Sequence, residues 1–427
     1  MTGNQPSTPK TQLLLRARLV MPISQPPIVN GGVAVRGEQI IAVGNWREIS
    51  SGFDGQVHDL GDVLLLPGLV NAHCHLDYTH MAGQFPPPRV FTDWIKLITS
   101  TKAEWGYSEF AESWLAGAKM LLGTGTTTVG DIETIPELLP EVWEATPLRV
   151  LSFLEMTGVK SRRKPQAILQ ATVDRINELP TGRCRLGLSP HAPYSTVPEL
   201  LRLSARQARR SRWPISIHVA ESAQEFEMFT RRQGEMFEWL RRNERNMSDC
   251  GIGSPVRHLE VCGALQRNLL AIHANYLADG DVALLARRKV TVVHCPRSHS
   301  YFRHSPFPFA RLRHAGVNIC LGTDSLASVY QRRREKVELN LFEEMREFAA
   351  CHPDETPADI LKMVTLHPAR ALGLQRRVGG IFPNAFADLI ALPFVGKSKQ
   401  AHDGVLNHRG ELAASMIGGQ WAIPPKE

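Results

Sequence analysis

Apolar residues in the middle of the chain fall into short runs, and a segment with helical periodicity follows each run. The runs are rich in β-branched residues, whereas segments such as PELLRLSARQARR and GDVALLARR repeat apolar positions every three to four residues. Strands alternating with helices predict an α/β fold with a parallel sheet. The eight runs cover residues 64–75, 126–132, 148–156, 184–192, 214–221, 269–276, 290–296 and 316–325.

Eight strand–helix units predict a (β/α)8 TIM barrel. The competing architecture is a doubly wound open sheet, which would place a glycine-rich phosphate turn after its first strand. The chain has His-Cys-His at that position, residues 73–75, so the barrel is favoured.

Both ends of the chain have a different pattern, in which short strands are separated by turns. TQLLLRARLVM, GGVAVRG and EQIIAVG lie near the N-terminus, and ADLIALP, GELAASMIGG and QWAI lie near the C-terminus. The two ends therefore predict one small composite β-sandwich domain beside the barrel. The expected segments are 1–64 and 375–427 for the two parts of this domain and 65–374 for the barrel.

The composition is that of a globular protein with reduced cysteines. Hydrophobic residues make up 43% of the chain and charged residues 21%, which excludes a disordered or collagen-like chain. The seven cysteines include no CxxC pair, which argues against a disulfide framework. The N-terminus has no signal-peptide pattern, and no apolar run reaches the length of a membrane helix. We therefore expect a cytoplasmic protein with no membrane partner.

The net charge is +7, from 49 basic and 42 acidic residues. The basic residues are spread through Arg-rich helical stretches without a nucleic-acid-binding motif, so we interpret them as solvated helix faces and expect no nucleic-acid partner. Arg332, Arg333 and Arg334 follow the last predicted strand. They either begin a solvated helix or attract an anionic substrate, and the sequence leaves both alternatives open.

Residues with metal-binding chemistry stand at the ends of the predicted strands. His73 and His75 are two positions apart, so on a strand both imidazoles point to one face and can bind one metal ion. The ends of later runs carry His191, His218, His273, His294 and Asp324. Strand carboxyl ends meet at one end of a barrel, so these side chains are predicted to converge on an active site. Glu221, three residues after His218, is predicted to act as a proton shuttle there.

Several motifs occur in the order typical of one enzyme family: PGLVNAHCHLD, SPHAPYS, HVAE, LLAIHA, VVHCPRS and LGTDSLAS. With these motifs the chain resembles the amidohydrolase superfamily, and more narrowly its mononuclear deaminase branch. That branch includes cytosine deaminase, S-adenosylhomocysteine deaminase and the s-triazine hydrolases. The stretch from HCPRS to LGTDSLAS is also similar to aminofutalosine deaminases. The fourth run ends in His191 and has no lysine where dinuclear relatives carry one, which favours a single metal ion.

The resemblance implies one divalent metal ion with four ligands: His73, His75, His218 and Asp324. It also implies Glu221 as the general acid/base and His273 as the residue that orients the metal-activated water. The chemistry of such a site further suggests that Asp324 accepts the water proton while Glu221 protonates a ring nitrogen. Three imidazoles and one carboxylate suit Zn²⁺, and Fe²⁺ accepts a similar set.

Two further residues are implied to contact the substrate. His191 lies in SPHAPYS, and Trp94, in FTDWI, stands where relatives place an aromatic wall. His294 is left outside the ligand set and is interpreted as a hydrogen-bonded structural histidine.

The expected activity is therefore that of a metal-dependent hydrolase of carbon–nitrogen bonds other than peptide bonds. We expect a deaminase that releases ammonia from a purine-like, adenosine-like or related heterocyclic amine. The alternative is a hydrolase of cyclic amidines, cyclic amides or s-triazines in the same site. A non-catalytic barrel is disfavoured, because all four ligands and Glu221 are present. Relatives often form homo-oligomers, and the sequence leaves the oligomeric state open.

Overall fold

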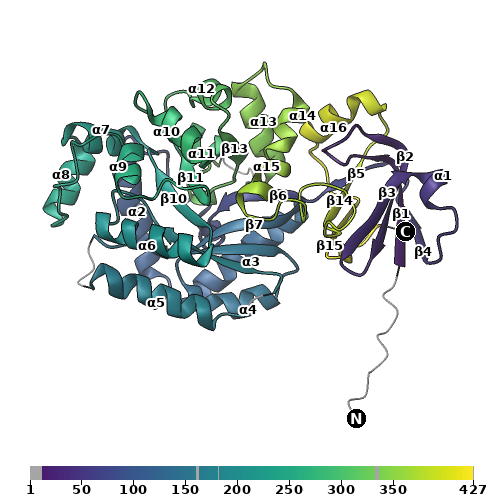
Figure 1. Cartoon of the computed structure of the whole chain (residues 1–427), viewed down its shortest axis with the longest axis horizontal. Coiled ribbons are helices and arrows are strands. Elements are labelled where there is room, and N and C mark those ends of the chain that lie inside the picture. The colour runs from purple at the N-terminus through teal and green to yellow at the C-terminus, as the bar shows by residue number, and fades with distance from the viewer. Residues whose placement is uncertain (1–11, 160–162, 181, 332–335, 427) are drawn as a thin grey trace, which may run out of the picture.

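The parallel strands of the structure form a barrel, and a second sheet stands beside it (Figure 1). The computed structural model describes residues 12–159, 163–180, 182–331 and 336–426. Each barrel strand lies within, or one residue beyond, a run predicted from the sequence, so the prediction of a TIM barrel is confirmed. The strands are β6 (Leu69–Cys74), β7 (Thr126–Glu133), β8 (Arg149–Met156), β9 (Arg185–Pro190), β10 (Ile215–Val219), β11 (Leu269–His273), β12 (Thr291–His294) and β13 (Asn318–Leu321).

Helices follow the strands and cover the outside of the barrel. In α6 (Pro198–Ser211) the buried side chains include Leu200, Leu201, Ala205 and Ala208, which form one face of the helix, while its arginines face solvent. Other helices are α2 (Phe91–Glu104), α3 (Tyr107–Gly123), α4 (Leu139–Glu144), α5 (Pro165–Glu178), α7 (Ala223–Arg231), α8 (Glu235–Arg242), α9 (Pro255–Val261), α10 (Asp281–Arg288), α11 (Pro296–Tyr301), α12 (Phe309–His314), α13 (Leu341–Cys351), α14 (Pro357–Lys362) and α15 (Leu366–Ala371). No helix in these described ranges is both long enough and apolar enough to cross a bilayer.

The barrel closes where its first strand meets its last. The backbone N–H groups of Thr323 and Asp324 donate hydrogen bonds to the carbonyl of His73, at 3.0 and 3.2 Å, and Cys74 pairs with Asp324. Gly322 lies against His73, and a Cβ at this glycine would come within 2.8 Å of the same carbonyl oxygen. Only glycine allows this approach, so Gly322 brings β6 and β13 close enough to join. We call this junction the barrel seam.

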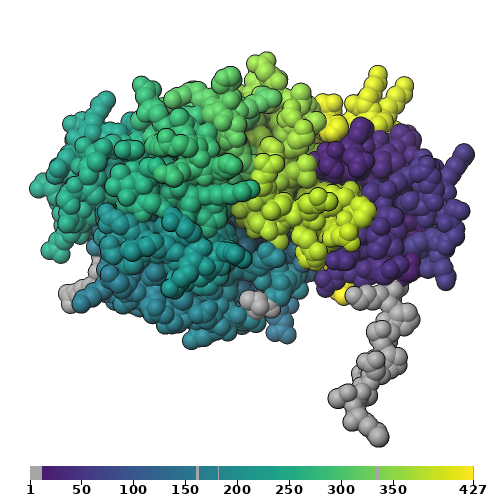
Figure 2. Space-filling view, viewed as in Figure 1, coloured from purple at the N-terminus to yellow at the C-terminus, as the bar shows by residue number. Residues whose placement is uncertain are grey.

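Strands from both termini form the second sheet. Its members are β1 (Gln12–Val20), β2 (Ile28–Arg36), β3 (Gln39–Asn45), β4 (Gln56–Asp59), β5 (Val63–Pro67), β14 (Leu389–Pro393), β15 (Ala414–Ile417) and β16 (Gln420–Ile423). β5 pairs antiparallel with β14, from Val63–Pro393 to Pro67–Leu389, and this pairing joins the two ends of the chain. In Figure 2 the yellow C-terminal residues accordingly lie against the purple N-terminal ones. A separate sheet built from both termini is therefore confirmed.

The two faces of this sheet pack against different cores. On β5, Val63 and Leu65 belong to the core of the sheet itself, whereas Leu64 and Leu66 belong to the core that it shares with the barrel. Alternation along the strand produces this division. The sheet thus extends past residue 64, and we propose the three segments of the sequence analysis as the domains, with β5 as the link between them.

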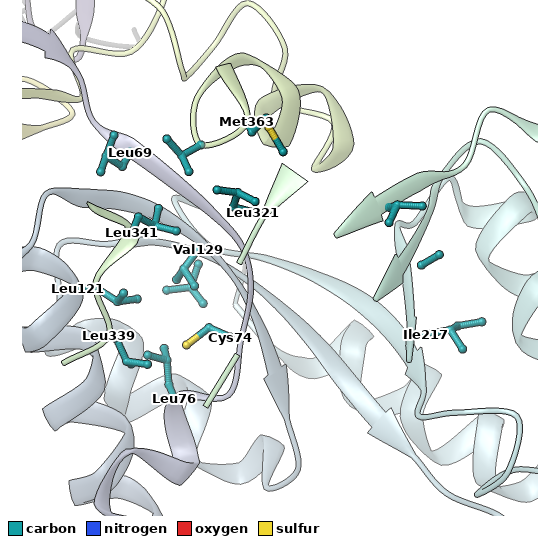
Figure 3. Close-up of a cluster of buried hydrophobic side chains, with 14 of the residues drawn as sticks. Leu69, Cys74, Leu76, Leu121, Val129, Ile217, Leu321, Leu339, Leu341 and Met363 are labelled. Atoms are coloured by element: carbon teal, nitrogen blue, oxygen red, sulfur yellow. The ribbon is translucent and has the colours of Figure 1, made fainter. Parts of the chain in front are cut away.

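The core beneath the barrel seam is apolar and includes Cys74 (Figure 3). Leu69, Val129 and Leu321 enter it from three strands, and Leu121 enters it from α3. The Cys74 side chain is fully buried in this cluster. Strand alternation therefore turns Cys74 away from the two histidines that flank it.

A buried ion pair fastens the second sheet to the barrel. Arg149, the first residue of β8, donates to both carboxylate oxygens of Asp388, at 2.6 and 3.2 Å. Asp388 also accepts a hydrogen bond from the backbone N–H of Gly418, at 2.7 Å. The guanidinium group of Arg149 lies 3.6 Å from the ring centre of Phe386.

We expect the Arg149→Met variant to lower the free energy of unfolding by about 3–5 kcal/mol, because Asp388 would stay buried without its cation. Urea unfolding followed by circular dichroism measures the loss. Lys96→Met is the control, since it removes an exposed pair with Asp93 and is expected to cost at most about 1 kcal/mol. An equally small loss for Arg149→Met would show that the pair does not hold the sheet.

Candidate active site

The four predicted metal ligands meet at the carboxyl end of the barrel. His73 is on β6, His75 follows β6, His218 is on β10, and Asp324 follows β13. The Nε2 atoms of His75 and His218 are 3.3 Å apart, and Asp324 Oδ1 lies 3.6 Å from His73 Nε2 and 3.8 Å from His75 Nε2. Side chains distant in the sequence thus aim their ligand atoms at one point.

The buried nitrogens of this cluster fit a metal ion. Both ring nitrogens of His73 and Nδ1 of His75 are buried and have no hydrogen-bond partner among the described residues. Leaving buried polar atoms unsatisfied is costly, and three imidazoles with one carboxylate form a donor set that Zn²⁺ accepts. His73, His75 and His218 form one group able to hold a metal ion, and His273, Cys295 and Asp324 form an adjacent group.

Asp324 is fixed in place by two hydroxyl groups. Its Oδ2 accepts hydrogen bonds from Ser298 Oγ at 2.7 Å and from Ser328 Oγ at 3.3 Å, which leaves Oδ1 facing the histidines. Burial alone would raise the pKa of Asp324, but the imidazoles of His73 and His273 lower it well below its usual range. The Asp324 carboxylate is therefore anionic, and its Oδ1 can serve as an oxygen ligand for a metal ion.

The backbone at the strand ends adopts an unusual conformation. Four residues there have φ between 50° and 72°, a region that residues other than glycine rarely adopt: Ala220, His273, Ala274 and Asp324. Such backbone persists when the surroundings enforce it, and it clusters at functional sites. Here the positive φ values occur next to, or at, the residues predicted to do the chemistry.

Glu221 and His273 lie side by side at this end of the barrel. Glu221 Oε1 is 3.4 Å from His273 Nε2. The backbone of Glu221 is held at both ends, since its N–H donates to Glu225 and its carbonyl accepts from Asn275 Nδ2 at 3.0 Å. Burial, and then the charges of Asp324 and Glu225, raise the pKa of Glu221 well above its usual range. A carboxyl group with a raised pKa can both hold and release a proton near neutral pH.

A cavity of about 370 Å³ opens above the ligand cluster, and every predicted site residue except His73 lines it. Trp94, on α2, forms part of the wall, and its indole N–H donates to the carbonyl of Ala327 at 3.3 Å. His191, which follows β9, bonds Ser195 Oγ through Nδ1 at 2.6 Å. His73 lies deeper and is almost completely buried.

The cavity contains polar residues that the sequence analysis did not find. Glu155, near the end of β8, places Oε2 4.0 Å from His191 Nε2. Lys102 bonds the hydroxyl of Tyr78, whose ring stacks on His75 at 5.0 Å. Glu155 stands at the end of the run 148–156, so the rule that found the histidines could have found it too. Lys102 has no such signal, because it is brought in by the packing of α2.

His294 lies outside this cluster. Its ring stacks on Phe307 with centres 3.9 Å apart, and its buried Nδ1 has no hydrogen-bond partner among the described residues. Leaving His294 out of the ligand set remains a prediction. Arg332, Arg333 and Arg334 lie outside the described residues.

Comparison with known proteins identifies the family. The profile of the amidohydrolase family matches residues 64–422, and the chain belongs to this family. It is therefore a hydrolase of carbon–nitrogen bonds other than peptide bonds, as the sequence predicts.

Individual relatives are deaminases. The 5-methylthioadenosine/S-adenosylhomocysteine deaminase of Syntrophobacter fumaroxidans is 32% identical over 385 residues, which cover 85% of this chain and 80% of the relative. The aminodeoxyfutalosine deaminase of Deinococcus radiodurans is 29% identical over 83% of this chain and 82% of its own. The zinc-bound crystal structure of an adenosine deaminase from Xanthomonas campestris has a TM-score of 0.82 at 24% identity, covering 97% of this chain and 94% of that one.

Proposed function

We propose that this protein is a zinc-dependent deaminase of adenosine-like substrates, acting in the cytoplasm. The observation that carries the proposal is the position of Glu221, whose carboxylate lies 3.4 Å from His273 beside the ligand cluster and faces the cavity. In the roles proposed here, Glu221 would be a proton-transfer group next to a metal-binding cluster, as hydrolytic deamination requires. The relatives are named as deaminases of 5-methylthioadenosine, S-adenosylhomocysteine and aminodeoxyfutalosine, which supports the substrate class.

The proposed ligands of the zinc ion are His73, His75, His218 and Asp324. When bound, the ion would lower the pKa of a water molecule towards neutrality and so provide the nucleophile. All seven cysteines are free, which agrees with a reducing compartment.

The residues of the chain would then move the protons. Asp324 and His273 both line the cavity, and Asp324 lies within the ligand cluster, so they would orient the attacking water, with Asp324 accepting its proton. Glu221 donates a proton to a ring nitrogen of the substrate as the new C–O bond forms. Asp324 then passes the proton it took from water to the amino group, the C–N bond breaks, and the nitrogen leaves as ammonia. The new hydroxyl group becomes an oxo group as its proton returns to Glu221, so both carboxyl groups end as they began. No group other than water is consumed.

We assign binding of the substrate's heterocyclic ring to the side chains that form the walls of the cavity. Trp94 offers an aromatic face, and His191 lies next to His218, with ring centres 4.8 Å apart, so it can contact the group attached to the reacting carbon. Glu155 and Thr157 line the same cavity and provide hydrogen-bond acceptors for hydroxyl groups of a substrate. A volume of about 370 Å³ is within the range of small-molecule sites.

The experiment is a measurement of ammonia release by the zinc-loaded protein. Adenosine, 5-methylthioadenosine, aminofutalosine, cytosine and an s-triazine form the panel. We expect release from the 6-aminopurine nucleosides, with conversion of the amino group to an oxo group seen by ultraviolet absorbance. Protein with a full complement of zinc that releases no ammonia from any purine would refute the substrate class.

The alternative is hydrolysis of a cyclic amidine, a cyclic amide or an s-triazine. It would use the same ligands and Glu221, so the geometry alone does not separate the two reactions. The relatives that match at 29–32% identity are deaminases, which favours the first proposal. Ring opening without ammonia release would favour the alternative.

A further inference from the structure

A second cavity lies at the opposite end of the barrel from the catalytic one. Its volume is about 1310 Å³, and it is bordered by residues that begin or directly precede β9 to β13, including Pro214, Asn268 and Asn318. The catalytic residues stand at the carboxyl ends of the same strands. The two cavities therefore do not share lining residues, and a ligand in one would not contact a ligand in the other.

The lining of this second cavity is strongly basic. No Asp or Glu is among the described residues that line it. Six lining side chains are cationic: Arg185, Arg209, Arg212, Arg267, Lys289 and Arg370. The whole chain has an excess of only seven basic residues, from 49 basic and 42 acidic. From the sequence, the basic residues are expected to be spread over solvated helix faces, but six cationic side chains lie around this one cavity.

These cations have no acidic partners in the described part of the chain. None of the six forms an ion pair with a carboxylate there, whereas Arg287 and Arg288, close to Lys289, both pair with Glu260. Arg209 donates to Gln266 and to the carbonyl of Gly263, so even its hydrogen bonds go to neutral groups. Like charges around a concave surface repel one another, and an anion in the hollow would remove that cost.

Helix dipoles explain only part of the arrangement. Arg209 and Arg212 lie at the C-terminal end of α6, and Lys289 follows α10, where cations compensate the helix dipole. Arg185 opens a β-strand and Arg267 lies in the loop before β11, so neither is explained in this way. The feature that all six cationic residues share is that they line this cavity.

We propose that this cavity binds a small polyanion that carries several phosphate groups. Guanidinium groups form paired hydrogen bonds with phosphate oxygens, and five of the six cations are arginines. Its volume of about 1310 Å³ exceeds the usual range of small-molecule sites, which leaves room for a ligand with several phosphate groups. The sequence has no nucleic-acid-binding motif, which favours a compact ligand over a nucleic-acid strand. Trp213, half-buried in the lining, adds an aromatic surface for an organic group on such a ligand.

The test uses the whole 427-residue chain loaded with zinc and two probes, inorganic triphosphate and ATP. Triphosphate is the primary probe, because the adenine of ATP could also enter the catalytic cavity. Isothermal titration calorimetry at low ionic strength measures binding by the wild type and by R185Q/R267Q/R370Q. All three positions are exposed, so the variant is expected to fold. The matched control is R36Q/R231Q/R242Q, which removes three exposed charges outside the cavity and changes the net charge equally.

We expect triphosphate to bind the wild type and the control alike, and to bind R185Q/R267Q/R370Q at least about tenfold more weakly. Adenosine, which lacks phosphate, is expected to show no binding that depends on these three arginines. The proposal is overturned if triphosphate does not bind the wild type at millimolar concentration, or if both triple variants lose affinity equally. Much tighter binding of a single-stranded RNA than of triphosphate would also overturn it.

Discussion

Replacing Glu221 with glutamine is expected to lower kcat by about 10²–10⁴-fold, the range that general acid–base catalysis contributes. Glutamine keeps the size of the side chain but cannot exchange a proton. The backbone contacts of residue 221 with Glu225 and Asn275 do not involve the replaced group, so the local fold is expected to persist. Steady-state ammonia release on the best substrate of the panel, with zinc content measured in parallel, gives the result.

The control is Glu227→Gln, because Glu227 lies on α7, the helix that follows Glu221, and accepts a hydrogen bond from Gln233 outside the cavity. It is expected to leave kcat within about twofold of the wild type, as is usual for surface positions. A Glu221→Gln protein that holds its zinc and keeps more than half of its activity would mean that another group transfers the protons. Loss of zinc together with activity would mean instead that Glu221 supports the metal site.

Removing the His73 side chain is expected to abolish tight zinc binding and, with it, the activity. Changes to groups that only support a ligand already cost about 10–100-fold in metal affinity, and His73 is proposed as a ligand itself. The affinity of His73→Ala for zinc is therefore expected to fall by more than about 100-fold. Atomic emission of the dialysed protein measures zinc per chain, and the melting temperature with and without added zinc measures the linked loss of stability.

His80→Ala is the matched control. His80 is exposed and lies in the short 3-10 helix Leu76–Met81 that follows His75, so it is near the ligands in sequence but not in the cavity lining. We expect this variant to retain one zinc ion per chain. Full zinc content in His73→Ala would show that the ion is held by a different set of residues, of which His273, Cys295 and Asp324 form the adjacent candidate group.

The barrel could be predicted from the sequence because each of its strands corresponds to a short apolar run that is visible within a few consecutive residues. Runs such as VTVVHCP and PISIHVAE are short, apolar and β-branched, and β12 and β10 lie within them. The convergence of the histidines followed from the geometry of the barrel, since each stands at the end of such a run. His218 and His273 could therefore be placed together without any knowledge of the side-chain contacts between them.

Features that depend on packing between distant elements could not be predicted in this way. Lys102 reaches the cavity because α2 lies across its mouth, and nothing in the periodicity of that helix indicates which face it turns inward. Asn275 contacts the carbonyl of Glu221 only because two neighbouring strand ends are in register. The pairing of Arg149 with Asp388 joins residues that are 239 positions apart. The basic hollow likewise gathers arginines from separate loops and helix ends.

The pairing of β5 with β14 has a consequence for the order in which the chain folds during synthesis. The ribosome releases β5 long before β14, because residues 67 and 389 are 322 positions apart. All the barrel strands emerge in that interval, so the barrel can assemble while one edge of β5 still has no neighbour. An open strand edge flanked by the apolar side chains of Val63, Leu65 and Leu66 is a template for association with other chains. The nascent chain is therefore most dependent on protection by chaperones in the interval before its last strands appear.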